Sequence, residues 1–167
     1  MFKKQLLLAE KIAKEYGAHV IEGDAIYDGE MDIYAPCALG ATLNDDTIDR
    51  LQCSVVAGAA NNQLLDEEVH GKRLMEKGIV YAPDFLINAG GLINVYREVE
   101  GISEARAMEL TENIYHTTLD IFKKSAKEGL TPQIIQYKTI EAYRELSKSP
   151  NAKLIIGSGQ QPILMEP

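Results

Sequence analysis

The chain has 167 residues, of which 46% are hydrophobic and 25% charged, and its net charge is −8 at neutral pH. This length suits one domain, and the composition supports a buried core. The acidic balance argues against a nucleic-acid binder, and no apolar run approaches the roughly 18–20 residues that a membrane span needs. We therefore expect a soluble, cytoplasmic protein. Its two cysteines cannot build a disulfide framework.

Short apolar segments alternate along the chain with longer amphipathic patterns. The expected strands are residues 18–21, 31–35, 53–57 and 79–82. The expected helices are residues 3–16, a helix that starts at 44–47, and residues 63–77, 91–99 and 103–128. Strands that alternate with helices indicate an α/β fold built from βαβ units around a parallel sheet. Such strands read as apolar runs because they are buried on both faces of the sheet.

The longest expected helix and the C-terminal segment complete the pattern. In the helix over residues 103–128, apolar side chains are predicted to lie near one face; they are Ile102, Ala105, Met108, Tyr115, Leu119, Phe122 and Ala126. A further helix is expected from Thr131-Pro132 to about residue 148, because proline suits the first helical position. A short strand over residues 153–156 is expected to follow.

The segments that follow the predicted strands are the candidate binding sites, since ligands of parallel sheets lie beyond the carboxyl ends of the strands. They are residues 36–40, 58–63 and 83–91. Their small residues let a flat ligand approach the backbone, and the amides of Asn61, Asn62 and Asn88 each offer a donor and an acceptor. A nicotinamide carboxamide or a ribose hydroxyl pair needs that combination. Ordinary tight turns use the same residue types, so both interpretations stand.

Other polar residues admit two interpretations each. Cys37 follows a strand, so it is either a thiolate nucleophile or a small buried residue. The acidic runs 45–46 and 66–68 fit helix starts better than metal ligands. The histidines show no ligand spacing with the cysteines, so we expect no structural zinc site. Leu92 and Val95 would share a helix face, which either packs into the core or lines an apolar pocket beside Asn88.

Three long motifs carry a resemblance to a known family. They are residues 32–41 (DIYAPCALGA), 56–64 (VAGAANNQL) and 78–95 (GIVYAPDFLINAGGLINV). In this order they resemble the glutamate/leucine/phenylalanine/valine dehydrogenase family, and most of all its leucine-specific members. The resemblance runs from residue 1 to about residue 130.

The resemblance implies that residues 1–130 are a partial Rossmann-type domain that binds NAD. It also implies oxidative deamination of a branched-chain L-amino acid to its 2-oxo acid and ammonia. By resemblance, the cofactor-binding residues are Ala35, Cys37 and Ala38 beside the cofactor, Asn61 and Asn62 near the nicotinamide ribose, and Asn88 on the nicotinamide side. Leu92 and Val95 correspond to the pocket for the aliphatic side chain of the substrate, which discriminates weakly among such side chains.

The chain also departs from the family pattern. The family's substrate domain, with its catalytic lysines and aspartate, and its Gly-x-Gly-x-x-Gly phosphate turn have no counterpart in the 167 residues. We therefore assign no catalytic residue here and expect the isolated chain to be inactive, because a positioned base and a phosphate site are missing. The exposed edge of a shortened parallel sheet predicts a homo-oligomer or a partner that supplies the missing part.

Residues 131–167 are expected to form a separate segment with a helix, a short strand and a tail. Residues 130–167 weakly resemble the C-terminus of prohibitin/stomatin-like proteins. This resemblance implies a second hypothesis, that of a non-enzymatic assembly or scaffold module. The simpler alternative is a diverged helix followed by one short strand.

Overall fold

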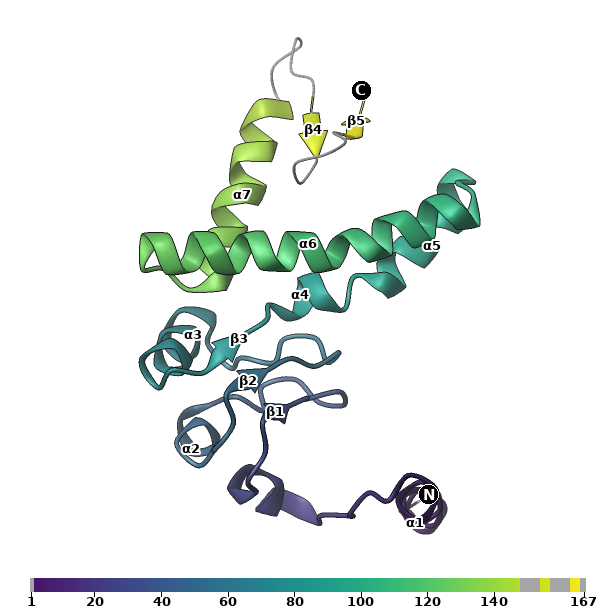
Figure 1. The fold of residues 1–167 in the computed structure, drawn as a ribbon, viewed down its shortest axis with the longest axis vertical. Coiled ribbons are helices and arrows are strands. Elements are labelled where there is room, and N and C mark those ends of the chain that lie inside the picture. Colours follow the sequence, from purple (N-terminus) through teal and green to yellow (C-terminus); the bar gives the residue numbers. More distant parts are fainter. Residues whose placement is uncertain (1, 148–153, 157–162, 166–167) are drawn as a thin grey trace.

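The computed structural model describes residues 2–147, 154–156 and 163–165 (Figure 1). Its helices are α1 (Phe2–Tyr16), the 3₁₀ helix η1 (Gly23–Asp28), α2 (Asp45–Ile48), α3 (Glu67–Glu76), α4 (Asp84–Ile87), α5 (Gly90–Glu100), α6 (Glu104–Glu128) and α7 (Pro132–Ser147). Its strands are β1 (Ile33–Tyr34), β2 (Val55–Val56), β3 (Val80–Tyr81), β4 (Leu154–Ile156) and β5 (Ile163–Met165).

A parallel sheet in the order β1-β2-β3 forms the centre of the fold, which confirms the expected α/β class. Both pairings are in register, so Tyr34 lies beside Val56 and Val56 beside Tyr81. The helices α2 and α3 lie along the same side of this sheet in Figure 1. Each strand is shorter than its apolar run, because the flanking residues enter the loops at the sheet's ends.

Burial alternates along the strands, so the expectation that both faces of the sheet are buried is wrong. Tyr34, Val56 and Tyr81 are buried, with at most 8% of each residue exposed. On the opposite face Ile33 is 57% exposed and Val80 is 44% exposed. Successive side chains in a strand point to opposite faces, and the described helices cover only one of them. Apolar runs alone do not reveal whether a second layer is present.

The buried face packs with α2 and α3 into the main apolar core. This core contains Tyr34, Leu43, Ile48, Leu51, Cys53, Val56, Leu64, Leu74, Ile79 and Tyr81. Four of these side chains, Leu43, Ile48, Val56 and Leu74, have no exposed surface at all. At about 25 cal/mol per Å² of buried apolar area, such side chains dominate the stability of this region.

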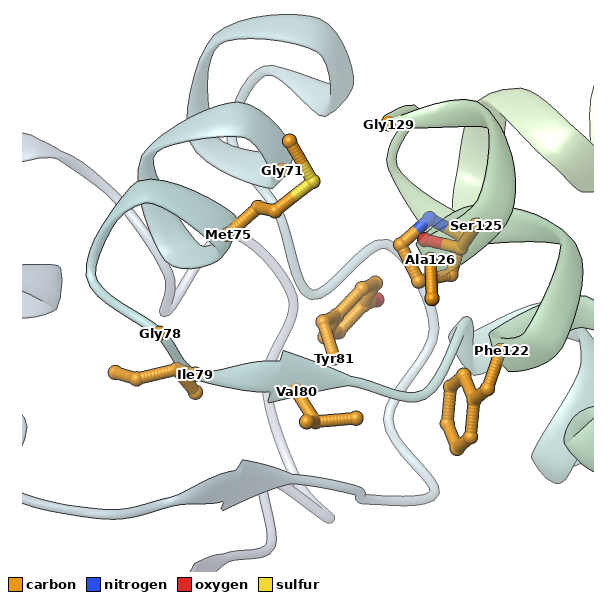
Figure 2. Close-up of a pocket in the computed structure, with 11 residues that line it drawn as sticks. Gly71, Met75, Gly78, Ile79, Val80, Tyr81, Phe122, Ser125, Ala126 and Gly129 are labelled. Atoms are coloured by element: carbon orange, nitrogen blue, oxygen red, sulfur yellow. The ribbon is translucent and has the colours of Figure 1, made fainter.

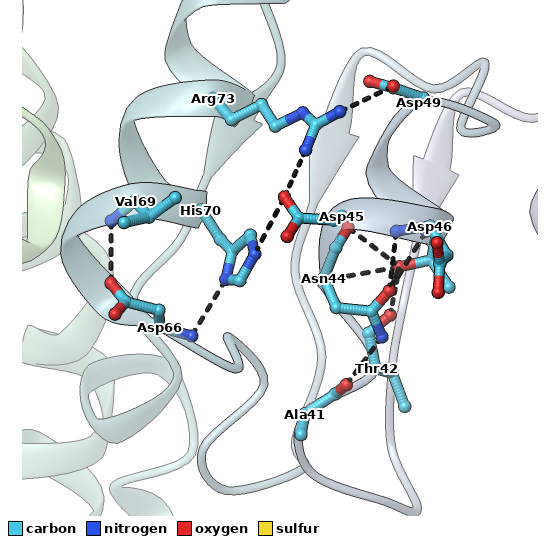
Figure 3. A network of polar contacts seen from close by, with 11 residues as sticks. Ala41, Thr42, Asn44, Asp45, Asp46, Asp49, Asp66, Val69, His70 and Arg73 are labelled. Atoms are coloured by element: carbon cyan, nitrogen blue, oxygen red, sulfur yellow. Dashed lines mark hydrogen bonds and ion pairs between the residues drawn. The ribbon is translucent and has the colours of Figure 1, made fainter.

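Polar caps and ion pairs hold α2 against α3 (Figure 3). Asn44 caps α2 by accepting the backbone N–H groups of Asp46 and Thr47 at 3.0 and 3.2 Å. Asp66 caps α3 by accepting the N–H of Val69 at 2.8 Å. Arg73 then joins α3 to Asp45 and Asp49 at the two ends of α2. The predicted helix starts at both acidic runs are therefore confirmed.

The helical part lies beyond β3, where the long helix α6 crosses above the sheet and packs against both α5 and α7 (Figure 1). Its buried cluster is small and consists of Leu86, Ile121 and Ile135. The packing face of α6 is not the predicted one: Ala107 and Ile121 are buried, whereas Met108 and Tyr115 are 55% and 65% exposed. The stripe thus faces outward at Met108 and Tyr115, whereas Phe122 and Ala126 near its end line a groove between α6 and the sheet.

A groove of about 500 Å³ separates α3 and β3 from the end of α6. Met75, Tyr81, Phe122 and Ala126 are among the residues that line it (Figure 2).

The chain ends differ from the expectations in two places. The predicted strand over residues 18–21 is wrong: these residues have no regular structure, and η1 follows them. The predicted strand near residue 154 is confirmed as β4, and it pairs in an antiparallel manner with β5, which was not expected. Residues 148 and 153, which bounded two of the expected elements, lie outside the described residues.

Candidate cofactor site at the carboxyl edge of the sheet

The segments after β1 and β2 meet at the carboxyl edge of the sheet with almost no space between them. Ala60 donates its backbone N–H to the carbonyl oxygen of Pro36 at 2.9 Å. A Cβ atom on Gly58 would lie 2.1 Å from that same oxygen. Only glycine fits at position 58, so this residue sets how closely the two loops approach.

The segments after β2 and β3 are joined by a pair of side-chain amides. Asn88 donates its Nδ2 to the Oδ1 of Asn61 at 2.6 Å, with a longer contact of 3.4 Å to the carbonyl oxygen of Ala59. Asn61 Nδ2 and Asn88 Oδ1 make no hydrogen bond to any other residue that the structure describes. The pair therefore presents one remaining donor and one remaining acceptor at the edge of the sheet.

Asn62 follows directly in a left-handed conformation, with φ at 52°. Its carbonyl oxygen accepts the N–H of Ala41 at 2.7 Å, so the Asn62 backbone holds the first loop in place. Asparagine tolerates this region of φ better than most residues, and its side chain remains exposed. The structure thus brings Asn61, Asn62 and Asn88 to one edge, as the sequence analysis expected of these loops.

Ala35, Cys37 and Ala38 line the first loop and are exposed. The thiol of Cys37 accepts a weak hydrogen bond from the N–H of Ala59 at 3.5 Å. The interpretation of Cys37 as a buried residue is therefore wrong, because the close approach of the two loops leaves its side chain on their outer surface.

Buried support for this edge comes from Gln63 and Asp84, which the sequence analysis did not single out. The Nε2 of Gln63 donates to the carbonyl oxygens of Gly58 and Ala60 at 2.6 and 2.9 Å. The Asp84 carboxylate accepts the N–H of Gln63 at 3.0 Å and that of Phe85 at 2.6 Å. Gln63 was expected to begin a helix, but α3 starts only at residue 67. An acid directly after a strand and its proline is the signal that could have revealed Asp84.

Two tyrosines of the sheet face low-dielectric surroundings near these loops. Burial, together with a smaller effect of its neighbour Tyr27, raises the pKa of Tyr34 to about 12. Burial also raises the pKa of Tyr81 above its usual value, and the nearby Asp84 carboxylate acts in the same direction. Both hydroxyls are therefore neutral and able to donate hydrogen bonds near neutral pH.

Leu92 and Val95 lie on the first turns of α5, which begins two residues after Asn88. They are 73% and 54% exposed, so the interpretation that they pack in the core is wrong. Their apolar face is open to a ligand or to another protein surface.

The structure provides neither a metal centre nor a membrane span within its described part. In residues 2–147, 154–156 and 163–165, no cluster of three or more histidine, cysteine or acidic side chains could hold a metal ion. Among the same residues, no helix combines the length and apolar character needed to cross a membrane.

A parallel sheet with close loops and amide side chains at its carboxyl edge defines a partial Rossmann-type α/β domain. The sequence model of the family described as Glutamate/Leucine/Phenylalanine/Valine dehydrogenase matches residues 3–148, and the chain belongs to this family. The match includes α7 and so extends past residue 130. The domain boundary at 130 and the prohibitin/stomatin resemblance of residues 130–167 stay predictions.

Known relatives agree with this assignment. A leucine dehydrogenase of Thermoactinomyces intermedius is 48% identical over 147 residues, which are 88% of this chain and 40% of that protein. An L-tryptophan dehydrogenase of Nostoc punctiforme is 46% identical over 88% of this chain and 42% of that protein. The crystal structure of L-tryptophan dehydrogenase from Nostoc punctiforme superposes with a TM-score of 0.79 at 47% identity, covering 84% of this chain and 42% of that one. The chain thus spans less than half the length of these relatives.

Proposed function

We propose that this chain forms the cofactor-side part of an NAD-dependent amino-acid dehydrogenase that converts branched-chain L-amino acids to 2-oxo acids and ammonia. The observation that carries the proposal is the Asn61–Asn88 amide pair, which keeps one donor and one acceptor at the carboxyl edge of the sheet. A nicotinamide carboxamide has the complementary acceptor and donor, so these residues fit the group. Relatives named as leucine dehydrogenases support a branched-chain substrate.

When bound, NAD supplies the acceptor for the hydride that leaves the substrate. The residues of this chain would bind and orient the cofactor: Asn88, paired with Asn61, would contact the nicotinamide side, Asn61 and Asn62 would lie near the nicotinamide ribose, and Ala35, Cys37 and Ala38 would lie beside the cofactor. The small side chains of the first loop allow close approach to the backbone. Orientation of this kind lowers the barrier to transfer because the reacting groups meet in a productive geometry.

Leu92 and Val95 line the pocket for the substrate's side chain. Their open apolar face on α5 follows Asn88 by one to two helical turns, which supports a pocket near the nicotinamide side of the cofactor. A methylene in such a pocket contributes about 1–3 kcal/mol, so leucine is preferred over valine rather than required. Relatives named for tryptophan and phenylalanine show that this family accommodates larger side chains as well.

The 167-residue chain is inactive by itself under this proposal, because it holds neither a Gly-x-Gly-x-x-Gly turn nor a residue that we assign to catalysis. Purified chain mixed with leucine and NAD is expected to give no rise in NADH absorbance. A cytoplasmic location and assembly with further copies, or with a partner, belong to the same proposal.

A chimera provides the direct test. The 147 matched residues of the Thermoactinomyces intermedius leucine dehydrogenase are replaced by those of this chain, and NADH production is followed with leucine, phenylalanine and tryptophan. We expect activity that is highest with leucine. Asn88→Ala should raise the KM for NAD at least tenfold, since it removes the amide pair, whereas Asn94→Ala on α5 serves as the control. A folded chimera without dehydrogenase activity would overturn the proposal.

The second candidate function is the non-enzymatic assembly module. It is favoured by the exposed apolar side chains along α5, which are Leu92, Val95, Tyr96 and Val99. Light scattering on the purified chain, combined with the activity of the chimera, separates the two candidates. Large assemblies that the double substitution Val95→Ser and Val99→Ser dissolves, together with an inactive chimera, would favour the assembly module.

A further inference from the structure

A buried glutamine at the start of α7 has a side-chain amide without a hydrogen-bond partner among the residues that the structure describes. Gln133, in the first turn of α7, is 2% exposed. Neither its Nε2 nor its Oε1 makes a hydrogen bond to any residue that the structure describes, and both atoms are closed off from bulk solvent. A buried polar group without a hydrogen bond destabilises the folded state, so two such groups on one side chain are unusual in a stable protein.

The position of Gln133 is fixed by its neighbour on α3. The side chain lies against the backbone of Gly71, where an added Cβ would be 2.8 Å from Nε2 and 3.3 Å from the amide carbon. Gly71 is itself buried, so this face of the amide offers no partner and no room to turn outward. The hydrogen bonds of Gln133 must therefore be made on its other side.

On that side Gln133 lines a narrow cavity that has polar groups on its walls. Asn62, Glu67, Tyr81 and Asp84 also line it, and the centre of a water molecule has about 10 Å³ in which to move. This volume suits one water molecule and little else. Each carboxylate oxygen of Asp84 accepts one backbone N–H and has a second lone pair left, while the Tyr81 hydroxyl is kept protonated by burial.

The chemistry of the amide distinguishes between the possible occupants. The Oε1 of Gln133 needs a donor, and its Nε2 needs an acceptor. A water molecule supplies both, whereas a monovalent cation satisfies the oxygen and leaves the N–H group unpaired. We propose that a single ordered water molecule occupies this cavity and bridges Gln133 to Asp84 and Tyr81.

This water would connect α7 to the support of the cofactor edge. The Asp84 carboxylate accepts a hydrogen bond from the backbone N–H of Gln63. The Gln63 side chain in turn donates hydrogen bonds to the carbonyl oxygens of Gly58 and Ala60. The bridge therefore extends a continuous chain of hydrogen bonds from α7 to the loop that carries Asn61. It does not depend on the proposed enzyme activity.

The test is a crystal structure of the 167-residue chain at a resolution that shows ordered water. We expect a density peak at hydrogen-bonding distance, roughly 2.7–3.2 Å, from Gln133 and from Asp84 or Tyr81. The peak should disappear in Gln133→Met, which keeps the length of the side chain, and should remain in the matched control Gln136→Met one turn further along α7. A cavity without density, or a peak that persists in Gln133→Met, would overturn the proposal.

Two further measurements complete the design. Crystals soaked in thallium(I) should show no anomalous signal in the cavity, and a signal there would identify a cation site instead. In solution, the side-chain amide of Gln133, assigned by its loss in Gln133→Met, should show a cross-relaxation peak with a long-lived water molecule. This NMR readout on the unmodified chain decides the question even if the variant does not fold, and its absence contradicts the water.

Discussion

The sheet region, residues 33–82, and the helical region, residues 90–147, bury their apolar side chains to different extents. In the first, β1–β3 pack with α2 and α3 around a continuous core. In the second, no residue of α5, all of which the structure describes, is buried, and the cluster beneath α6 is small. Amphipathic helices occur in both regions, so the difference lies in whether a second layer covers the apolar stripe. The open stripe of α5, together with the exposed Met108 and Tyr115 of α6, thus marks a surface that an additional layer would cover.

The largest expected difference between the regions comes from truncating a leucine in each. Leu74 on α3 has no exposed surface, and Leu74→Ala should destabilise the chain by about 3 kcal/mol through lost burial and a new cavity. Leu92→Ala on α5 should cost less than about 0.5 kcal/mol, because that side chain is 73% exposed. Urea unfolding of both variants measures the difference. Equal losses would mean that α5 is covered in solution, by a second copy for example.

Replacing a glycine by alanine should lower the stability of the chain in the sheet region and raise it in the helical region. A Cβ on Gly58 would collide with the Pro36 backbone, so Gly58→Ala should cost about 2 kcal/mol and separate the loops at the carboxyl edge of the sheet. A Cβ on Gly91, in the first turn of α5, meets nothing within 4 Å, and Gly91→Ala should stabilise the chain by about 0.5 kcal/mol. Thermal unfolding of both variants shows whether each substitution raises or lowers the stability. A stabilised Gly58→Ala would show that the two loops are not in close contact.

The same contrast shows what the sequence could predict. The strands β1–β3 and the polar caps at residues 44 and 66 followed from local patterns, since caps and βα turns depend on neighbouring residues, whereas the expected strand over residues 18–21 and the expected helix start at residue 63 were wrong. The burial of one sheet face, the exposure of Cys37 and the packing face of α6 depend on which elements meet in space. Gln63 and Asp84 were missed for the same reason: they act through contacts about twenty residues apart, for which local spacing has no signal.

Alkaline pH should weaken the sheet region first. The pKa of Tyr34 is raised to about 12 in the folded chain, from an ordinary value near 10, mainly by burial. The folded state then keeps a proton that the unfolded state releases, so stability is present below pH 10 and is lost as the pH rises towards 12. Between pH 10 and 11 the loss due to Tyr34 should be about 1 kcal/mol.

Urea unfolding at pH 9, 10 and 11 measures this loss, and Tyr34→Phe should reduce it. Tyr137 in the helical region provides the comparison. Its hydrogen bond to Glu67 raises its pKa to about 12 as well, but it is 41% exposed, so Tyr137→Phe should change the pH dependence less. A greater reduction by Tyr137→Phe than by Tyr34→Phe in the loss of unfolding free energy between pH 9 and 11 would be the opposite result. It would contradict the conclusion that Tyr34 is the more buried of the two tyrosines.

The smallest expected difference concerns the helix caps. Asn44 caps α2, a helix of four residues whose other end Lys77 holds through the carbonyl oxygens of Ile48 and Asp49. Asn44→Ala should lower the free energy of unfolding by about 1 kcal/mol, because α2 is a single turn and carries the buried Ile48.

Ser103 caps α6 by accepting the N–H of Arg106 at 3.2 Å, but this helix has 25 residues and its first two residues, Glu104 and Ala105, are exposed. Ser103→Ala should therefore fray one turn and cost about 0.5 kcal/mol, at the low end for a lost cap. Amide hydrogen exchange separates the two cases: faster exchange should extend from α2 to core residues in Asn44→Ala and stay within residues 104–107 in Ser103→Ala. Exchange that spread along α6 would instead show that the helical region depends on this cap, since little tertiary packing stabilises it.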